Sequence, residues 1–184
     1  AVYPDVSARE NVRFFARLYG LSGSSLRTEV DRALEFVGLE SAADRKPATY
    51  SGGMKRRLNI ACGIVHRPRL VLLDEPTVGI DPQSRNHILS SVRQLNREGC
   101  TVVYSSHYME EVERICSRVA ILDHGQVIAD GTLYELKSLV TDATTAFLRQ
   151  FGLAGDVVAF VFLVIVVVVV VLLLVSIPLY FLAR

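Results

Sequence analysis

The chain has 184 residues, with 20 Lys or Arg against 19 Asp or Glu and a net charge of +1. This length suits one ordinary domain, and the balanced charge gives no indication of nucleic-acid binding. The 51% hydrophobic content is uneven, because residues 157–183 contain no charged residue, His, Asn or Gln. Roughly 20 apolar residues cross a bilayer core as a helix. We therefore predict a transmembrane helix over 157–183 in contact with a lipid bilayer, with a very hydrophobic core segment as the alternative.

The three cysteines, Cys62, Cys100 and Cys116, lack the paired spacing of a metal site. Cysteines of this kind are typical of reduced thiols in a cytosolic domain. We interpret them as small buried hydrophobic side chains.

Residues 1–50 predict helices with no strand between them. Ser7 and Glu10 have the spacing of a capping box, and an apolar stripe runs from there to Tyr19. A second apolar stripe predicts a helix over 28–37. We therefore expect residues 1–50 to form a small all-helical subdomain.

From residue 51 onward, helical patterns alternate with short apolar strands. Helices are predicted over 51–65, 81–97, 109–117 and 133–139, and strands over 70–73, 101–104 and 119–122, with 126–129 as a hairpin partner of the third strand. This alternation predicts βαβ units and a parallel sheet, so the fold class is α/β. We interpret 51–139 as part of this sheet domain and 140–156 as a linker to the membrane segment.

Two acids, Asp74 and Glu75, directly follow the first apolar strand. Ligands of open parallel sheets bind at the carboxyl ends of the strands, where one carboxylate can hold Mg²⁺ or its water and another can deprotonate an attacking water. His107 lies just past the next strand, so it shares this edge if the two strands are neighbours. There it can hydrogen-bond a terminal phosphate. Taken alone, the acids also fit a surface turn and the histidine a structural role.

Ser51, Gly52 and Gly53 open a helix and form a candidate anion site. Ser51 can cap the helix, the glycines let a phosphate approach closely, and the helix N-terminus offers free amides. An ordinary capped helix is the alternative, and the basic run that follows, Lys55–Arg57, is interpreted as a solvated face. Asp81, followed by a proline, marks another helix start.

Taken in order, these motifs resemble the ATP-binding cassettes of ABC transporters. The resemblance covers about residues 1–139: 1–19 resembles the segment after the Q-loop, 50–55 the signature motif, 70–76 the Walker B strand with its catalytic glutamate, 78–81 the D-loop, and 106–107 the switch histidine. The Met-Lys-Arg-Arg run of the signature is similar to the drug- and polysaccharide-export type. The resemblance implies part of a P-loop NTPase-type parallel sheet with a helical subdomain.

The resemblance also implies a role for each residue at the sheet edge. Asp74 would bind Mg²⁺ through water, Glu75 would be the general base for the hydrolytic water, and His107 would contact the γ-phosphate. The implied function is the ATP-hydrolysing domain of a membrane exporter, with ATP and Mg²⁺ as cofactors.

The remaining motif residues imply a partner. Ser51, Gly52 and Gly53 would contact the ATP held by a second cassette, identical or different, and Asp81 would cross the interface near that site. A transporter membrane domain would be the other partner. The implied location is the cell membrane, with the ATPase domain on the cytoplasmic face.

One motif of the family is missing, because no G-x-x-x-x-G-K-[ST] phosphate loop occurs in the 184 residues. This loop holds the β- and γ-phosphates in P-loop proteins, so we expect an N-terminally truncated cassette that binds ATP poorly by itself. Two alternatives stay open. One is a membrane-tethered, non-enzymatic remnant that binds partners, and the other is a soluble ABC ATPase of translation or DNA repair.

Overall fold

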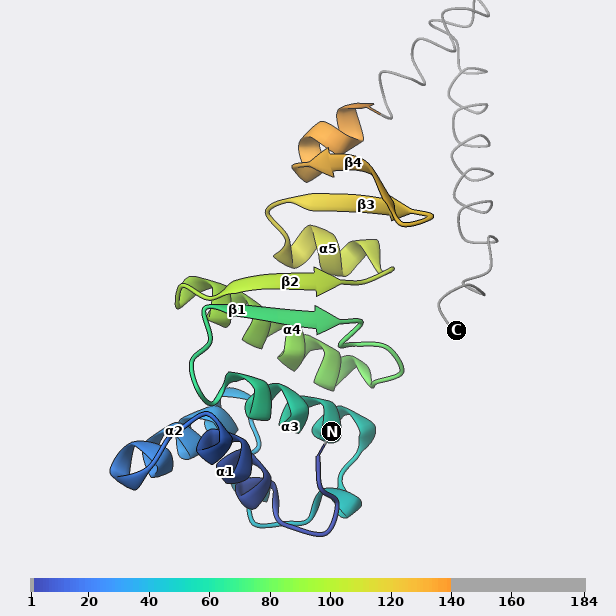
Figure 1. Ribbon diagram of the computed structural model, residues 1–184. Coiled ribbons are helices and arrows are strands. Elements are labelled where there is room, and N and C mark those ends of the chain that lie inside the picture. The colour runs from blue at the N-terminus through green and yellow to red at the C-terminus, as the bar shows by residue number, and fades with distance from the viewer. Residues whose placement is uncertain (1, 140–184) are drawn as a thin grey trace, which may run out of the picture. The chain divides into compact units, whose positions relative to one another are not determined.

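The structure is a computed structural model that describes residues 2–139 (Figure 1). The chain divides into two compact units, Ala1–Cys116 and Ser117–Arg184. The predicted linker over 140–156 and the predicted transmembrane helix over 157–183 lie outside the described residues. Across residues 2–139, no helix is both long enough and apolar enough to cross a membrane.

The first unit opens with helices, as predicted. They are α1 (Ala8–Leu18), α2 (Gly23–Phe36), the short 3₁₀ helices Glu40–Ala42 and Pro47–Thr49, and α3 (Gly52–Ile64). The predicted capping box of α1 is confirmed: Ser7 Oγ accepts from the Glu10 amide at 3.2 Å, and the Glu10 carboxylate accepts from the Ser7 amide at 2.8 Å. Helix α2 begins well before the predicted start at residue 28. The prediction missed this start because the Gly-Ser-Ser opening of the helix has the composition of a loop.

A β-α-β unit follows α3. Strand β1 (Leu70–Asp74) and strand β2 (Thr101–Ser105) are joined through helix α4 (Pro82–Arg97), and α5 (Met109–Ile115) ends slightly before the predicted residue 117. The two strands pair in parallel, with Asp74 opposite Ser105. The predicted parallel pairing of these two strands is therefore confirmed.

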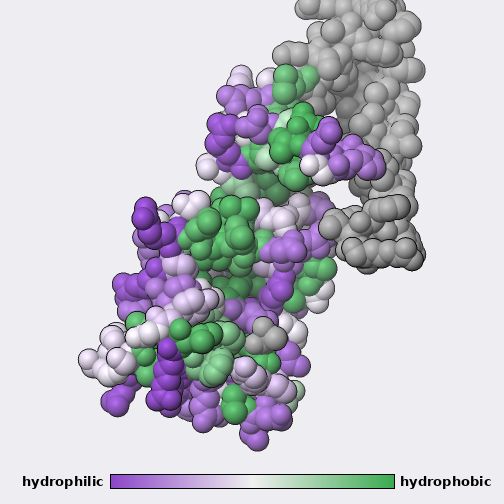
Figure 2. Space-filling model, in the orientation of Figure 1, coloured by the Kyte–Doolittle hydropathy of each residue, from purple (hydrophilic) through white to green (hydrophobic). Residues whose placement is uncertain are grey.

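The two faces of the β1–β2 sheet differ in burial. Val71, Leu73, Val102 and Tyr104 face the core that the helices of this unit share. On the opposite face Leu70, Leu72 and Val103 are exposed, and Figure 2 shows a hydrophobic area over the two strands. The buried face fixes the strands against the helices and so fixes where their carboxyl ends lie.

The second unit holds a hairpin. Strand β3 (Val119–Asp123) pairs antiparallel with β4 (Gln126–Gly131), as predicted, and residues 133–139 are helical. His124 and Gly125 both have positive φ, 46° and 78°, which suits a two-residue hairpin turn. The alternating pattern also predicted β3 in the parallel sheet; this stays a prediction, because β1 and β2 lie in the first unit and β3 in the second.

Candidate functional site

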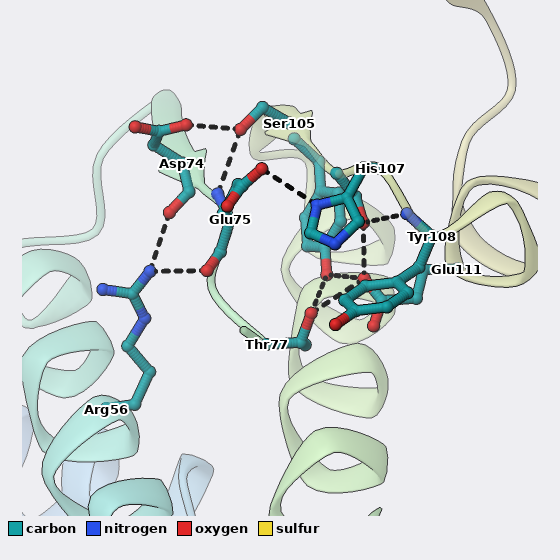
Figure 3. A network of polar contacts seen from close by, with 10 residues as sticks. Arg56, Asp74, Glu75, Thr77, Ser105, His107, Tyr108 and Glu111 are labelled. Carbon is teal, nitrogen blue, oxygen red and sulfur yellow. Dashed lines mark hydrogen bonds and ion pairs between the residues drawn. The ribbon is translucent and has the colours of Figure 1, made fainter. Parts of the chain in front are cut away.

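The carboxyl ends of β1 and β2 bring the predicted acids to one edge of the sheet (Figure 3). Because the parallel register sets Asp74 opposite Ser105, the Ser105 hydroxyl donates to Asp74 Oδ1 at 2.5 Å. The next amide, that of Glu75, donates to both the Ser105 carbonyl at 3.2 Å and the Ser105 hydroxyl at 3.0 Å. Ser105 therefore ties the two acids to the neighbouring strand, a function that the sequence did not reveal.

Glu75 and His107 meet at this edge. Glu75 Oε1 lies 3.0 Å from His107 Nδ1, and the two side chains are 40% and 42% exposed. The expectation that neighbouring strands would bring these residues together is thus met. A carboxylate beside an imidazole, both open to solvent, can take up and pass on a proton from a bound water. We call Asp74, Glu75, Ser105 and His107 the edge cluster.

The Glu75 backbone is strained. Its φ is 42°, a left-handed value that non-glycine residues seldom adopt. Residues held in this region are enriched at functional sites, where the surrounding contacts over-determine the conformation. At Glu75 those contacts include the two bonds to Ser105 and the guanidinium of Arg56.

Arg56 holds the turn after β1 from the side of helix α3. Its Nη2 donates to the carbonyls of Asp74 at 2.7 Å and Glu75 at 2.8 Å, and its Nε donates to the Pro76 carbonyl at 3.1 Å. Arg57 likewise donates to the carbonyls that end α2. The interpretation of Lys55–Arg57 as a solvated face is therefore wrong for the two arginines. Their partners are backbone carbonyls, which no side-chain pattern in the sequence marks.

The other predicted residues gather where α3 and α4 begin. The Ser51 hydroxyl accepts from the Met54 amide at 3.2 Å, and an Asp81 oxygen accepts from the Ser84 amide at 2.8 Å, so both predicted caps are confirmed. The bond from the Ser84 amide is also the main reason that the pKa of Asp81 lies below its usual range. The caps order the N-terminal turns of both helices.

The starts of α3 and α4 lie close together because Gly53 has no side chain. A Cβ on Gly53 would lie 2.2 Å from Ser84 Oγ and 2.9 Å from Asp81 Oδ1, whereas a Cβ on Gly52 would meet nothing within 4 Å. Gly53 is thus buried for helix packing, while Ser51, Gly52 and Asp81 are exposed. We call these four residues the helix-start cluster. The exposed members leave amides of the α3 N-terminus open to an anion.

The predicted site residues therefore fall into two clusters. Arg56 connects them, because it belongs to α3, which begins in the helix-start cluster, and donates to the turn after β1, which carries the edge cluster. Among residues 2–139, no group of three or more His, Cys, Asp or Glu is placed to hold a metal ion.

Comparison with known proteins bears on this arrangement. The ABC transporter family matches residues 1–78. A linearmycin resistance ATP-binding protein of Bacillus subtilis (strain 168) is 50% identical over 153 residues, 83% of this chain and 49% of the relative. A daunorubicin/doxorubicin resistance ATP-binding protein of Streptomyces peucetius is 45% identical over 133 residues, 72% of this chain and 40% of the relative. The chain spans about half the length of the curated relatives it matches.

Solved structures show the same fold. The ATP-binding subunit of an ABC transporter has a TM-score of 0.65 and 29% identity, covering 89% of this chain and 63% of that one. The dimeric structure of a post-hydrolysis state of an ATP-binding cassette, bound to ADP and Pi, has a TM-score of 0.63 and 29% identity, covering 72% of this chain and 59% of that one. The described residues thus share the α/β fold of these ATP-binding proteins.

Proposed function

We propose that this chain, a homologue of the ATP-binding components of ABC transporters, takes part in ATP hydrolysis that drives export across a membrane. One observation carries the proposal: the Glu75 carboxylate and the His107 imidazole lie 3.0 Å apart at the carboxyl edge of the β1–β2 sheet. The strained Glu75 backbone and the fixed positions of its neighbours support it.

In the proposed reaction, the edge cluster acts on the terminal phosphate of ATP. Glu75 takes the proton from the attacking water, and the His107 imidazole, held by Glu75, hydrogen-bonds the γ-phosphate oxygens. Asp74 would hold Mg²⁺ through water; one of its carboxylate oxygens is fixed by Ser105 and the other points away from it (Figure 3). When bound, Mg²⁺ would offset charge on the phosphates, completing its coordination with water and phosphate oxygens.

The helix-start cluster has a separate proposed part. Its exposed residues Ser51 and Gly52 would present the N-terminal amides of α3 to an anion. Gly53 lets Asp81, at the start of α4, lie beside them. We propose that this cluster contacts the nucleotide held by a second cassette, identical or different. The dimeric neighbour bound to ADP and Pi supports a two-cassette arrangement.

The proposed setting is the cytoplasmic face of the cell membrane, with a transporter membrane domain as the further partner. The names of the relatives support export, since they include drug-resistance proteins and Nod factor export ATP-binding protein I of Burkholderia pseudomallei (strain K96243), 45% identical over 128 residues, 70% of this chain and 42% of the relative. The transmembrane helix over 157–183 stays a prediction from the sequence.

The test must supply a phosphate loop, because the 184 residues contain none. We would mix the full chain at increasing ratios with the Bacillus subtilis linearmycin resistance ATP-binding protein and measure phosphate release with Mg²⁺ and ATP. The wild-type chain should change the relative's rate in a saturable way. The Gly52→Asp variant should lose the effect, since its new charge repels phosphate. Gly52→Ala, which has free space for its methyl group, should retain most of it.

A second assay addresses the edge cluster. Removing a general base typically lowers a rate by about 10²–10⁴-fold. Any hydrolysis by the chain alone should therefore fall by about that factor in Glu75→Gln. An unchanged rate in Glu75→Gln would refute its proposed role, and a mixture without any effect on the relative at any ratio would refute the role of the helix-start cluster.

The second candidate function from the sequence analysis is a membrane-tethered protein that binds partners without hydrolysing ATP. Titration of the chain with labelled ATP and Mg²⁺, beside Glu75→Gln, separates the two. Saturable binding at micromolar concentrations supports the ATPase. No binding by the chain alone, together with unchanged ATP binding by the relative when the chain is added, supports the non-enzymatic function.

A further inference from the structure

Glu111, in helix α5, is a fully buried acid beside the edge cluster (Figure 3). Carboxylates are almost never fully buried unless they are paired. The function proposed above assigns Glu111 no role. Its surroundings therefore require an explanation of their own.

Four donors from four different segments converge on this carboxylate. Oε2 accepts from the hydroxyls of Thr77 at 2.9 Å, Tyr104 at 2.7 Å and Ser106 at 2.9 Å, and Oε1 accepts from Arg85 Nε at 2.6 Å. Burial alone would raise the pKa of Glu111, but these donors outweigh it and the pKa lies below its usual range. The site is thus built for an ionised carboxylate, because four donors aim at it.

Two of the donors flank the pair at the edge. Thr77 follows Glu75 by two positions in the turn after β1, and Ser106 directly precedes His107 after β2. The Ser106 hydroxyl also accepts from the Tyr108 amide at 3.0 Å, so it holds the backbone on both sides of the histidine. A single buried group thereby joins the loop that carries the acid to the loop that carries the imidazole.

Arg85 forms a second connection to the same histidine. Besides its bond to Glu111, its guanidinium lies 4.8 Å from the centroid of the Tyr108 ring, and that ring lies 4.2 Å from the ring of His107. A cation over an aromatic ring is attracted to it. Removing the carboxylate would free Arg85 and, with it, the packing against His107.

We propose that Glu111 is a positioning residue that fixes the spacing of Glu75 and His107 through the hydroxyls of Thr77 and Ser106. This inference rests on the function proposed for that pair. Its test reads the geometry of the pair in the chain without nucleotide, so a failure of the proposed ATPase function leaves the test intact.

The experiment uses the full chain labelled with ¹⁵N-histidine. The sequence has four histidines, so a His107→Asn spectrum identifies the His107 signals. A Glu75→Ala spectrum then gives the Nδ1 shift of an unpaired His107. The Glu111→Gln variant replaces two acceptor oxygens by one oxygen and one amino group. In this variant the His107 Nδ1 chemical shift should move toward the value measured in Glu75→Ala.

Three matched variants, each lacking one hydroxyl, guard against a Glu111→Gln chain that does not fold. Thr77→Val and Ser106→Ala remove the links to the two loops, and both should move the His107 shift. Tyr104→Phe removes a donor of the same kind that lies within strand β2, so it should move the shift less. A merely structural role for the carboxylate would give three variants with equal stability losses and the same His107 signal.

Two results would overturn the proposal. One is a folded Glu111→Gln chain, judged by circular dichroism, whose His107 shift equals that of the wild type. The other, decisive if Glu111→Gln is unfolded, is an unchanged His107 shift in both Thr77→Val and Ser106→Ala.

Discussion

The Glu75 carboxylate lies 3.0 Å from the His107 imidazole, and the backbone that carries this carboxylate has a φ of 42°. A left-handed conformation costs a non-glycine residue roughly 1–2 kcal/mol. The turn is held in this conformation by Arg56, which donates to three consecutive carbonyls, and by Ser105. The contact between the two side chains thus depends on a backbone that is unfavourable by itself.

Glycine at position 75 should therefore be more stable than alanine. Both Glu75→Gly and Glu75→Ala lose the contact with His107, but only the glycine relieves the strained φ. We expect Glu75→Gly to exceed Glu75→Ala by about 1 kcal/mol in the free energy of unfolding measured with urea, while neither supports hydrolysis. Equal stabilities would mean that the turn relaxes to a negative φ once the carboxylate is gone.

Gly52 and Gly53, at the start of α3, should respond differently to replacement by alanine. Gly53→Ala places a methyl group 2.2 Å from Ser84 Oγ, so α3 and α4 must separate. Overpacking of this kind costs about 1–3 kcal/mol. Gly52→Ala meets nothing within 4 Å and should be neutral or slightly stabilising. Thermal unfolding of the two variants measures the difference, and a Gly53→Ala chain as stable as Gly52→Ala would contradict the close helix contact.

Much of the fold was predictable because it depends on local patterns. The capping box at Ser7 and the caps at Ser51 and Asp81 each need only a few neighbouring residues, and the structure has all three. The pairing of β3 with β4 was predictable for the same reason, because a two-residue turn joins the two strands. A place for β3 in the parallel sheet depends instead on contacts far along the chain.

The same distinction between local patterns and long-range contacts applies to the candidate site. Asp74, Glu75 and His107 could be predicted to meet, because the carboxyl ends of neighbouring parallel strands share an edge. The residues that hold them in place could not. Arg56 donates to backbone carbonyls, and Glu111 gathers hydroxyls from separate segments, so neither has a periodicity or spacing that marks its role.

A test away from the site concerns Glu29 of α2. Its carboxylate accepts from Arg67 and from Arg32, both at 2.7 Å, and is 15% exposed. The bond from Arg67 is the largest reason that the pKa of Glu29 lies below its ordinary value of 4.5, with Arg32 adding to it against the opposing effect of burial. Because the folded-state pKa is the lower one, this stabilisation is complete above about pH 4.5 and is lost as the pH falls through the folded-state value.

Glu29→Gln should therefore lower the free energy of unfolding by up to about 1 kcal/mol at pH 7, and the difference from the wild type should shrink toward pH 3. Glu35→Gln is the matched control, since Glu35 is an exposed acid on the same helix. It should change stability by less than about 0.5 kcal/mol at either pH. A loss for Glu29→Gln that stays constant with pH would show that shape, and not charge, stabilises this contact.

Cys62 should resist thiol reagents in the folded chain. Burial raises its pKa to about 12, and its side chain faces the core with 5% of the residue exposed. The thiolate is the reactive form, so at pH 8 only about one Cys62 in ten thousand is reactive. Cys116 is only partly buried and should react first. Labelling followed by mass spectrometry, with Cys116→Ser as the control, should show Cys62 modified only above the urea unfolding transition. Rapid modification below it would mean that the core face of α3 opens in the folded chain.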